Sequence, residues 1–226
     1  MDGANSLFER LKATCVEDWK RYTHHDFVAG IADGTLPKAA FRHYLIQDYL
    51  FLIQFARAYA LAVYKSDTLA DMRQAGAGMS AILDTEMALH VEFCRGWNLS
   101  EIEMEAAPED PACMAYTRFV LERGMSGDLL DLHIALAPCI VGYAEIGARL
   151  TSDSATLTDG NPYGAWIAMY SSEDYQAVAT DEVAFLDDLM TRRAGPGRFD
   201  SLADTFGKAT RLEVDFWQMG LNHTGD

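Results

Sequence analysis

The chain has 226 residues, half of them hydrophobic, with 34 acidic and 18 basic residues and a formal net charge of −16. This size suits one domain with a sizeable core, which we place over residues 1–226. So acidic a chain repels phosphate backbones, and we expect no nucleic acid partner. The four cysteines are scattered without a C-x-x-C pair, which argues against a zinc site and a disulfide framework.

The first residues, Met-Asp-Gly-Ala-Asn-Ser, lack the basic and apolar regions of a signal peptide. We find no uninterrupted apolar run long enough to span a bilayer, and we therefore expect no membrane partner. Both observations favour a cytoplasmic location.

The first third of the chain predicts three helices. Ser6 can cap a helix through about residue 22, and a short helix follows over residues 25–32. Gly34 suits the left-handed position after a helix, and Pro37 suits the first turn of the next one. That next helix runs from Lys38 to about residue 65.

The middle of the chain continues in helices. Thr68 begins one that reaches about residue 97, and Ser100 with Glu103 reads as a capping box. Residues 106–111 form a loop, and a fifth helix carries Tyr116 and ends near residue 124. A sixth helix begins at Asp128 and extends to about residue 150.

The last third adds three more helices. Asn161 is the expected cap of a short helix through residue 170, with proline at its first position. Ser172 begins another helix to about residue 192, and a final one covers residues 200–221. Since no period-2 run resembles a strand, we predict an all-α, single-domain bundle of antiparallel helices.

Two acids fall within aromatic stripes of these helices. Tyr44, Asp48 and Phe51 share a stripe at helical spacing, and Glu213 shares one with Phe216. Burying an unpaired carboxylate is costly, so each acid either faces solvent or is held for a purpose.

Cys139 directly follows Pro138 inside an apolar helical run, and Tyr143 lies on the same face one turn later. The proline favours a bend or loosened turn just before the thiol. One interpretation is an inert buried cysteine in a kinked core helix. The other is a functional thiol beside a tyrosine.

Glu86 and His90 lie four residues apart on one helix face, and such groups suit iron or manganese. A single pair does not complete a two-metal site. We therefore interpret them as a helix-surface or supporting hydrogen-bond pair and expect no metal.

The chain resembles the TenA family, also called thiaminase II or aminopyrimidine aminohydrolase, nearly from end to end. Six motifs stand in the family's order. They are Gly-Ile-Ala-Asp-Gly-Thr-Leu-Pro (30–37), Gln-Asp-Tyr (47–49), Glu-Met-Ala-Leu-His (86–90), Pro-Cys-x-x-x-Tyr (138–143), Asn-Pro-Tyr-x-x-Trp-Ile (161–167) and Glu-x-x-Phe-Trp-x-Met (213–219).

This resemblance implies a heme oxygenase-like helical bundle, usually a homotetramer, that needs no cofactor. In the cysteine-containing branch it implies hydrolysis of 4-amino-5-aminomethyl-2-methylpyrimidine to the hydroxymethyl pyrimidine and ammonia, which salvages degraded thiamine. It also implies cleavage of thiamine between its pyrimidine and thiazole rings. The expected partner is thus a small aminopyrimidine or thiamine.

The resemblance also assigns residues. Cys139 matches the nucleophile, Asp48 the acid that holds the pyrimidine's amino group and ring nitrogen, and Glu213 the acid–base residue across the ring. The substrate-binding positions are Tyr116, Tyr143, Tyr170 and Phe51.

Three positions depart from the family pattern. Phe51 stands where tyrosine is common, Asp26 replaces a proline, and Val141 replaces an aromatic residue. The changes at Phe51 and Val141 affect pocket shape or substrate preference and leave the three chemical groups intact.

Three other classes of function stay open from the sequence. One is a metal-dependent oxidase of the same fold, suggested by Glu86 and His90. Another is a pyrimidine- or thiamine-binding protein without turnover, which would not require Cys139. The third is a transcriptional regulator, against which the net charge of −16 argues.

Overall fold

A computed structural model describes residues 6–223, and in these residues every regular element is a helix. The elements are α1 Leu7–Lys12, α2 Val16–Thr23, α3 Asp26–Asp33, α4 Lys38–Lys65, α5 Leu69–Ser80, the π-helix η2 Ala81–Glu86, α6 Met87–Gly96, α7 Glu101–Ala106, α8 Pro111–Ser126, α9 Leu129–Ser152, α10 Gly164–Ser171, α11 Glu173–Arg193 and α12 Arg198–Asn222. The predicted all-α class is confirmed.

Local sequence signals start and stop many of these helices. The side chains of Ser6, Thr68 and Ser172 each accept a hydrogen bond from a backbone N–H in the first turn of their helices. Capping boxes form at Ser100, as predicted, and at Asp128. Gly34 ends α3 in the left-handed conformation, with φ of 76°.

The predicted first helix, by contrast, is two helices with a break at residues 13–15. The Thr14 hydroxyl donates to the Leu11 carbonyl at 2.6 Å, which competes with the helical pattern. The break lets the rings of Phe8 and Trp19 pack edge to face, 5.4 Å apart. Tertiary packing thus overrides a continuous apolar period.

The start of α10 was also predicted wrongly. This helix begins at Gly164 rather than directly after Asn161. The Asn161 side chain accepts from the Tyr163 N–H at 2.8 Å and donates to the Ile31 carbonyl at 3.0 Å. Asn161 therefore ties a loop to the end of α3 rather than capping a helix.

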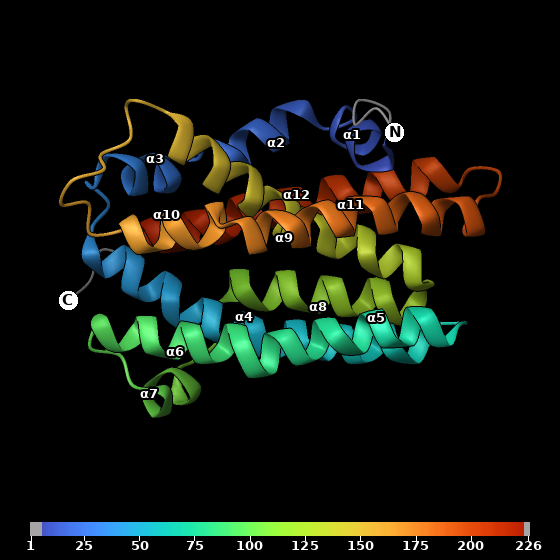
Figure 1. Cartoon of the computed structure of the whole chain (residues 1–226), viewed down its shortest axis with the longest axis horizontal. Helices are drawn as coiled ribbons and strands as arrows, with labels where there is room; N and C mark the ends of the chain where they lie inside the picture. Colours follow the sequence, from blue (N-terminus) through green and yellow to red (C-terminus); the bar gives the residue numbers. More distant parts are fainter. Residues whose placement is uncertain (1–5, 224–226) are drawn as a thin grey trace.

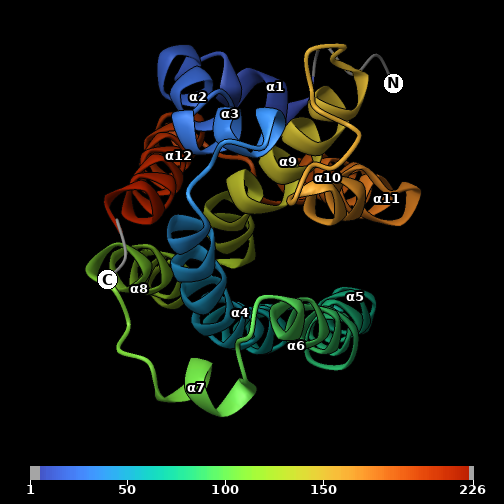
Figure 2. The same ribbon diagram turned by 90° about the vertical axis from the view of Figure 1, so that its left-hand side faces the viewer.

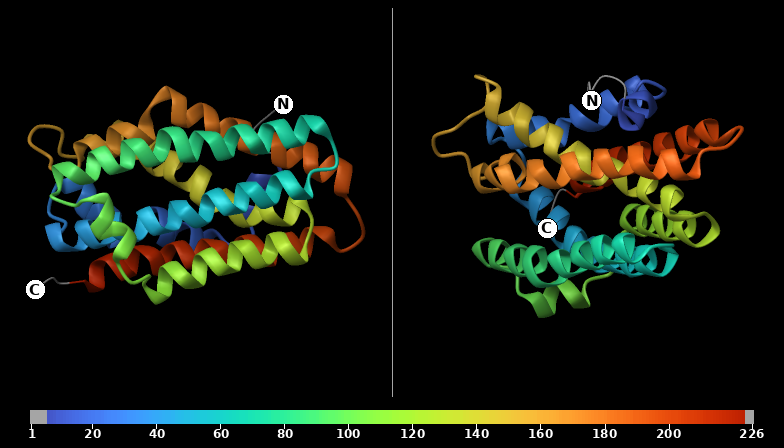
Figure 3. Two further views of the ribbon diagram at one scale, coloured as in Figure 1. Left: turned by 90° about the horizontal axis from the view of Figure 1, so that it is seen from below. Right: turned by 45° about the vertical axis from the view of Figure 1, so that its right-hand side comes forward.

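The helices form two layers joined by α8 and α12 (Figures 1 and 2). One layer contains α4, with α5, η2 and α6 running back along it in one continuous line (Figure 3). The other contains α9, which packs against α10 and α11. Because α8 and α12 contact both α4 and α9, residues far apart in sequence meet between the layers.

Helix α9 lies at the centre of the core, and every residue from 129 to 138 is buried. By length and composition alone α9 could cross a membrane, which corrects the expectation that no such segment exists. However, 83% of its most apolar 18-residue window is buried inside the protein. We therefore interpret α9 as a core helix, and it stays helical through Pro138.

Candidate active site

Helix α4 carries one acid of the site. Tyr44, Asp48 and Phe51 are all buried on the same face, as their spacing predicts, and Asp48 is 8% exposed. The ring of Phe51 lies 5.2 Å from that of Tyr116 on α8 and 5.7 Å from that of Phe216 on α12. Asp48 thus faces the interior rather than solvent.

The second acid comes from α12. Glu213 is 1% exposed, and the Tyr116 hydroxyl donates to its Oε1 at 2.8 Å. This bond joins α8 to α12 in the interior and satisfies one oxygen of a carboxyl group that is shielded from water.

Cys139 lies on α9 between two buried neighbours, yet its own side chain is only half-buried. Beside it, the Tyr22 hydroxyl donates to the carbonyl of Pro138 at 3.2 Å. Gly142 makes room for this contact, because a Cβ there would lie 2.2 Å from the Tyr22 ring.

Aromatic rings of α9 and α10 lie on another side of the site, and we call Tyr116, Tyr143 and Tyr170 together the aromatic wall. The rings of Tyr143 and Tyr170 lie 4.8 Å apart. This close approach requires Gly147, since a Cβ there would lie 2.5 Å from the backbone carbon of Tyr170. Gln176 on α11 donates to the carbonyls of both Ala144 and Tyr170, at 2.9 and 2.8 Å, and so fastens the three helices together.

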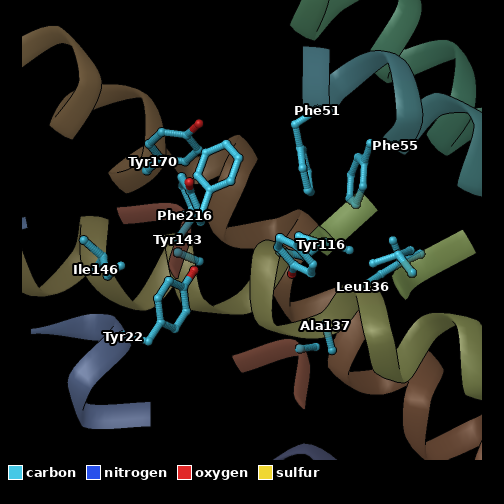
Figure 4. Packing of buried hydrophobic residues seen from close by; sticks show 14 of the residues in the cluster. Tyr22, Phe51, Phe55, Tyr116, Leu136, Ala137, Tyr143, Ile146, Tyr170 and Phe216 are labelled. Carbon is cyan, nitrogen blue, oxygen red and sulfur yellow. The ribbon is translucent and has the colours of Figure 1, made fainter. Parts of the chain in front are cut away.

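Figure 4 shows the resulting arrangement, in which rings from α4, α8, α10 and α12 gather beside α9. The structure brings together all the residues that the sequence proposed for catalysis and binding. These are Asp48, Phe51, Tyr116, Cys139, Tyr143, Tyr170 and Glu213.

Burial controls the ionisation of these groups. It raises the pKa of Asp48 to about 7 and that of Glu213 to about 8. It also raises the pKa of the Cys139 thiol well above its usual value, and the carboxylates of Glu213, Asp48 and Glu86 raise it further. The site therefore favours neutral acids and a neutral thiol.

We predicted that Glu86 and His90 form a helix-surface or supporting hydrogen-bond pair, and the surface alternative is wrong for His90. His90 is 7% exposed, and its Nε2 lies 2.9 Å from the Leu45 carbonyl oxygen. Its Nδ1 lies 3.5 Å from Oδ2 of Asp48. Glu86 is half-buried at the end of η2, where burial raises its pKa to about 7.

These two residues do not fit a metal centre. In residues 6–223, no three His, Cys, Asp or Glu side chains are grouped so that they could hold a metal ion. The contacts of His90 are with Leu45 and Asp48, so its role lies with the acid on α4.

Sequence reasoning missed two contributors to the site. Tyr22 binds the carbonyl before the thiol, and the ring of Tyr175 lies 4.9 Å from that of Tyr170. Burial raises the pKa of Tyr175 well above its usual value, and the charge of Cys139 adds to this rise. The only sequence signal for Tyr175 was its place one turn after the Ser172 cap.

The structure thus defines an all-α protein in which two buried acids and a thiol lie among aromatic rings, side chains of the kind that line small-molecule sites. Comparison with known proteins gives the family. Residues 13–223 match the model of the TENA/THI-4/PQQC family, and the chain belongs to that family.

Two curated relatives match nearly the whole chain. An uncharacterized protein of Haemophilus influenzae is 41% identical over 216 residues, 96% of this chain and 99% of its own. An aminopyrimidine aminohydrolase of Halalkalibacterium halodurans is 34% identical over 222 residues, 98% of this chain and 96% of its own.

Solved structures agree with the fold. A TenA family transcription regulator from Silicibacter sp. TM1040 has a TM-score of 0.90 at 48% identity, covering 95% of this chain and 96% of that one. A domain with a heme oxygenase-like fold from Shewanella denitrificans has a TM-score of 0.75 at 13% identity, covering 95% and 92%. The predicted heme oxygenase-like bundle is confirmed.

Proposed function

We propose that this protein hydrolyses 4-amino-5-aminomethyl-2-methylpyrimidine to the hydroxymethyl pyrimidine and ammonia, in the salvage of thiamine. The observation that carries this proposal is the meeting of Cys139, Asp48 and Glu213 within one aromatic site. The similarity to aminopyrimidine aminohydrolases over nearly the whole chain supports it.

The site suits an aminopyrimidine physically. Such a ring is flat and electron-poor, so it stacks well on the aromatic walls formed by Tyr116, Tyr143 and Tyr170. Its amino group and ring nitrogens need polar partners in an otherwise apolar space, and the two buried acids supply them. We assign Asp48 to the amino-bearing edge and Glu213 to the opposite ring nitrogen.

Cys139 is the proposed nucleophile. Its sulfur adds to a ring carbon, and the electron pair of that ring bond moves to the ring nitrogen, which takes a proton from Glu213. Glu213 in turn receives the thiol proton. The electron-rich ring then expels the exocyclic amine, which leaves as ammonia with the proton that the ring nitrogen had gained. Water adds its hydroxyl to the methylene, and its other proton goes to the ring nitrogen. Breaking of the carbon–sulfur bond passes that proton to sulfur and restores the thiol. One difficult displacement thus becomes several easier steps.

The protonation states support this sequence. Because its pKa is raised to about 8, Glu213 is largely protonated at neutral pH and available as a general acid. Because the pKa of Cys139 is also raised, the empty site holds a thiol rather than a thiolate. We propose that the thiol loses its proton only when the substrate is bound.

Three finer points belong to the same proposal. Thiamine is a second substrate, cleaved between its two rings by the same addition to the pyrimidine. The protein is cytoplasmic. It acts as a homotetramer, and size-exclusion chromatography with light scattering tests this oligomeric state directly.

The test is ammonia release by the purified wild-type protein, with and without a chelator. We expect ammonia from the aminomethyl pyrimidine, unchanged by the chelator, and free thiazole from thiamine. Loss of turnover with the chelator would favour the metal-dependent class. Binding of the pyrimidine without release of either product would contradict hydrolysis and favour a binding role.

A further inference from the structure

The orientation of the His90 ring is fixed at one end by a backbone carbonyl. Nε2 of His90 lies 2.9 Å from the carbonyl oxygen of Leu45, inside the protein. A carbonyl oxygen only accepts hydrogen bonds, so Nε2 must carry the proton. In the neutral ring Nδ1 is then left with a lone pair.

This lone pair faces Asp48. Nδ1 of His90 lies 3.5 Å from Oδ2 of Asp48, and both side chains are buried. A bare carboxylate oxygen opposite a bare nitrogen would be repelled, and the low local dielectric would make this repulsion costly. A proton shared by these two atoms turns the contact into an attractive one.

On the side of Asp48 away from His90, the hydrogen bond between Trp166 and Tyr44 also has a fixed direction. The indole Nε1 of Trp166 lies 3.2 Å from the Tyr44 hydroxyl oxygen, and an indole nitrogen only donates. The hydroxyl proton of Tyr44 is therefore free for an acceptor, and this hydroxyl lies close enough to Asp48, one helical turn later, to lower its pKa. Trp166 thus donates to Tyr44 at one end, His90 donates to the Leu45 carbonyl at the other, and Asp48 is in contact with His90 between them.

We propose that His90 is a positioning residue that holds Asp48 as a neutral carboxylic acid, with its proton directed at Nδ1 of His90. Asp48 then offers its other oxygen as an acceptor to the site. The pyrimidine as ligand rests on the proposed function, whereas the proton on Asp48 is a property of the protein without ligand.

Burial favours the uncharged form of both Asp48 and His90. It raises the pKa of Asp48 to about 7, which favours the neutral acid, although the Tyr44 hydroxyl lowers it. It also lowers the pKa of His90, which favours the neutral imidazole. The hydrogen-bond geometry and the burial therefore favour the same state, with one proton on Asp48 and none on Nδ1 of His90.

The other titratable groups around Asp48 are acids and weak acids. They come from α4, η2, α6 and α8–α12, and they are Tyr49, Glu86, Cys94, Cys113, Cys139, Tyr143, Tyr170, Tyr175 and Glu213. Two cations act on members of this set, since the charge of Arg42 lowers the pKa of Cys94 and that of Arg118 lowers the pKa of Cys113. Negative charge on any of these neighbours would further favour the neutral form of Asp48.

A neutral Asp48 defines the kind of ligand that the site prefers. Its free oxygen accepts an N–H of the exocyclic amino group without placing a negative charge beside the ring nitrogens. The preferred ligand is therefore an uncharged 4-aminopyrimidine rather than its ring-protonated cation. Affinity should fall as the pH rises above about 7 and Asp48 loses its proton.

Carbon-13 NMR of the Asp48 carboxyl group tests the protonation directly, in the protein without ligand. We expect its titration midpoint to lie near neutral pH in the wild type and at least about one unit lower in His90→Leu, which has no acceptor for the Asp48 proton. Glu86→Gln, one helical turn before His90, is the control and should change the Asp48 midpoint less. A wild-type midpoint near the ordinary value of about 4 would overturn the proposal.

Binding of 4-amino-5-hydroxymethyl-2-methylpyrimidine, measured by calorimetry, gives a second test without turnover. Asn mimics a neutral acid, so we expect Asp48→Asn to bind within about fivefold of wild type, and Asp48→Ala at least about tenfold more weakly. Equal losses in both variants would show that the charge of Asp48 is needed and would overturn the proposal.

The two proposals fail in distinguishable ways. If the wild-type protein releases no ammonia, the proposed hydrolysis is wrong, but the carboxyl titration still decides the state of Asp48. If ammonia is released and His90→Leu leaves the Asp48 midpoint unchanged, only the inference about His90 is wrong.

Discussion

Gly142 and Tyr22 together fix the backbone beside the proposed nucleophile. A Cβ at position 142 would lie 2.2 Å from Cε1 and 2.6 Å from the hydroxyl oxygen of Tyr22. The Tyr22 ring would have to move, and its hydrogen bond to the Pro138 carbonyl would be lost.

We therefore predict that Gly142→Ala lowers the free energy of unfolding by about 1–3 kcal/mol, as overpacked cores do. Urea unfolding measures this change. Gly76→Ala is the matched control, because a Cβ at position 76 meets nothing within 4 Å. Alanine there should raise stability by up to about 1 kcal/mol. Equal stabilities for the two variants would contradict this account of Gly142.

At this scale the sequence located the two acids of the site but not their partners. Helical spacing placed Asp48 and Glu213 among aromatic residues, and both are buried. The contact between Asp48 and His90 joins α4 to α6, and the bond between Tyr22 and Pro138 joins α2 to α9. Such contacts depend on how helices pack, which periodicity within one helix does not describe.

At the scale of elements, the approach of α10 to α9 sets the width of the aromatic wall. Gly147 allows the two helices to touch, and the rings of Tyr143 and Tyr170 then lie 4.8 Å apart. A Cβ at position 147 would meet the backbone of Tyr170 at 2.5 Å, and a backbone gives way less easily than a side chain.

We predict that Gly147→Ala displaces Tyr170 and lowers kcat/KM for the aminomethyl pyrimidine by about 10- to 100-fold. Steady-state kinetics measures this loss. Gly164→Ala in α10 itself is the control, since nothing lies within 4 Å of its added Cβ. If Gly147→Ala keeps wild-type kinetics, the close approach of these helices does not shape the site.

The bounds of most helices could be predicted because caps and breakers are local. Residues 38–65 were placed as α4 has them, and Thr68, Asp128 and Ser172 cap their helices. Two features could not be predicted from local sequence, the break between α1 and α2 and the π-helical turn η2. Both follow from packing against other helices. The π turn ends at Glu86, beside the site, where such turns are frequent in proteins.

At the scale of the whole molecule, buried carboxyl groups link stability to pH. Burial raises the pKa values of Asp48 and Glu86 to about 7 and of Glu213 to about 8, whereas in an unfolded chain they titrate near 4. The folded state therefore binds more protons between these values. The corresponding stability is fully present below about pH 4 and is lost as the pH rises through 7 to 8.

We predict that Glu213→Gln flattens this dependence. Removing one such group should reduce the slope of unfolding free energy between about pH 5 and 7 by up to about 1.4 kcal/mol per pH unit. Denaturant unfolding at several pH values measures the slope. Asp215→Asn, an exposed change on the same helix, is the control. An unchanged slope in Glu213→Gln would mean that Glu213 is ionised in the folded protein.

The central claim is that the core of this fold holds a nucleophilic thiol for aminopyrimidine hydrolysis. Two of its four cysteines are half-buried, Cys139 in the site and Cys15 before α2. They allow a matched comparison in which only one of the two thiols lies among the acids and aromatic rings.

The most direct measurement is ammonia release from 4-amino-5-aminomethyl-2-methylpyrimidine by the wild type, Cys139→Ala and Cys15→Ala. We predict wild-type turnover in Cys15→Ala and a loss of at least about 10³-fold in Cys139→Ala, with pyrimidine binding retained. Equal turnover in all three proteins would contradict the account and make Cys139 a packing residue.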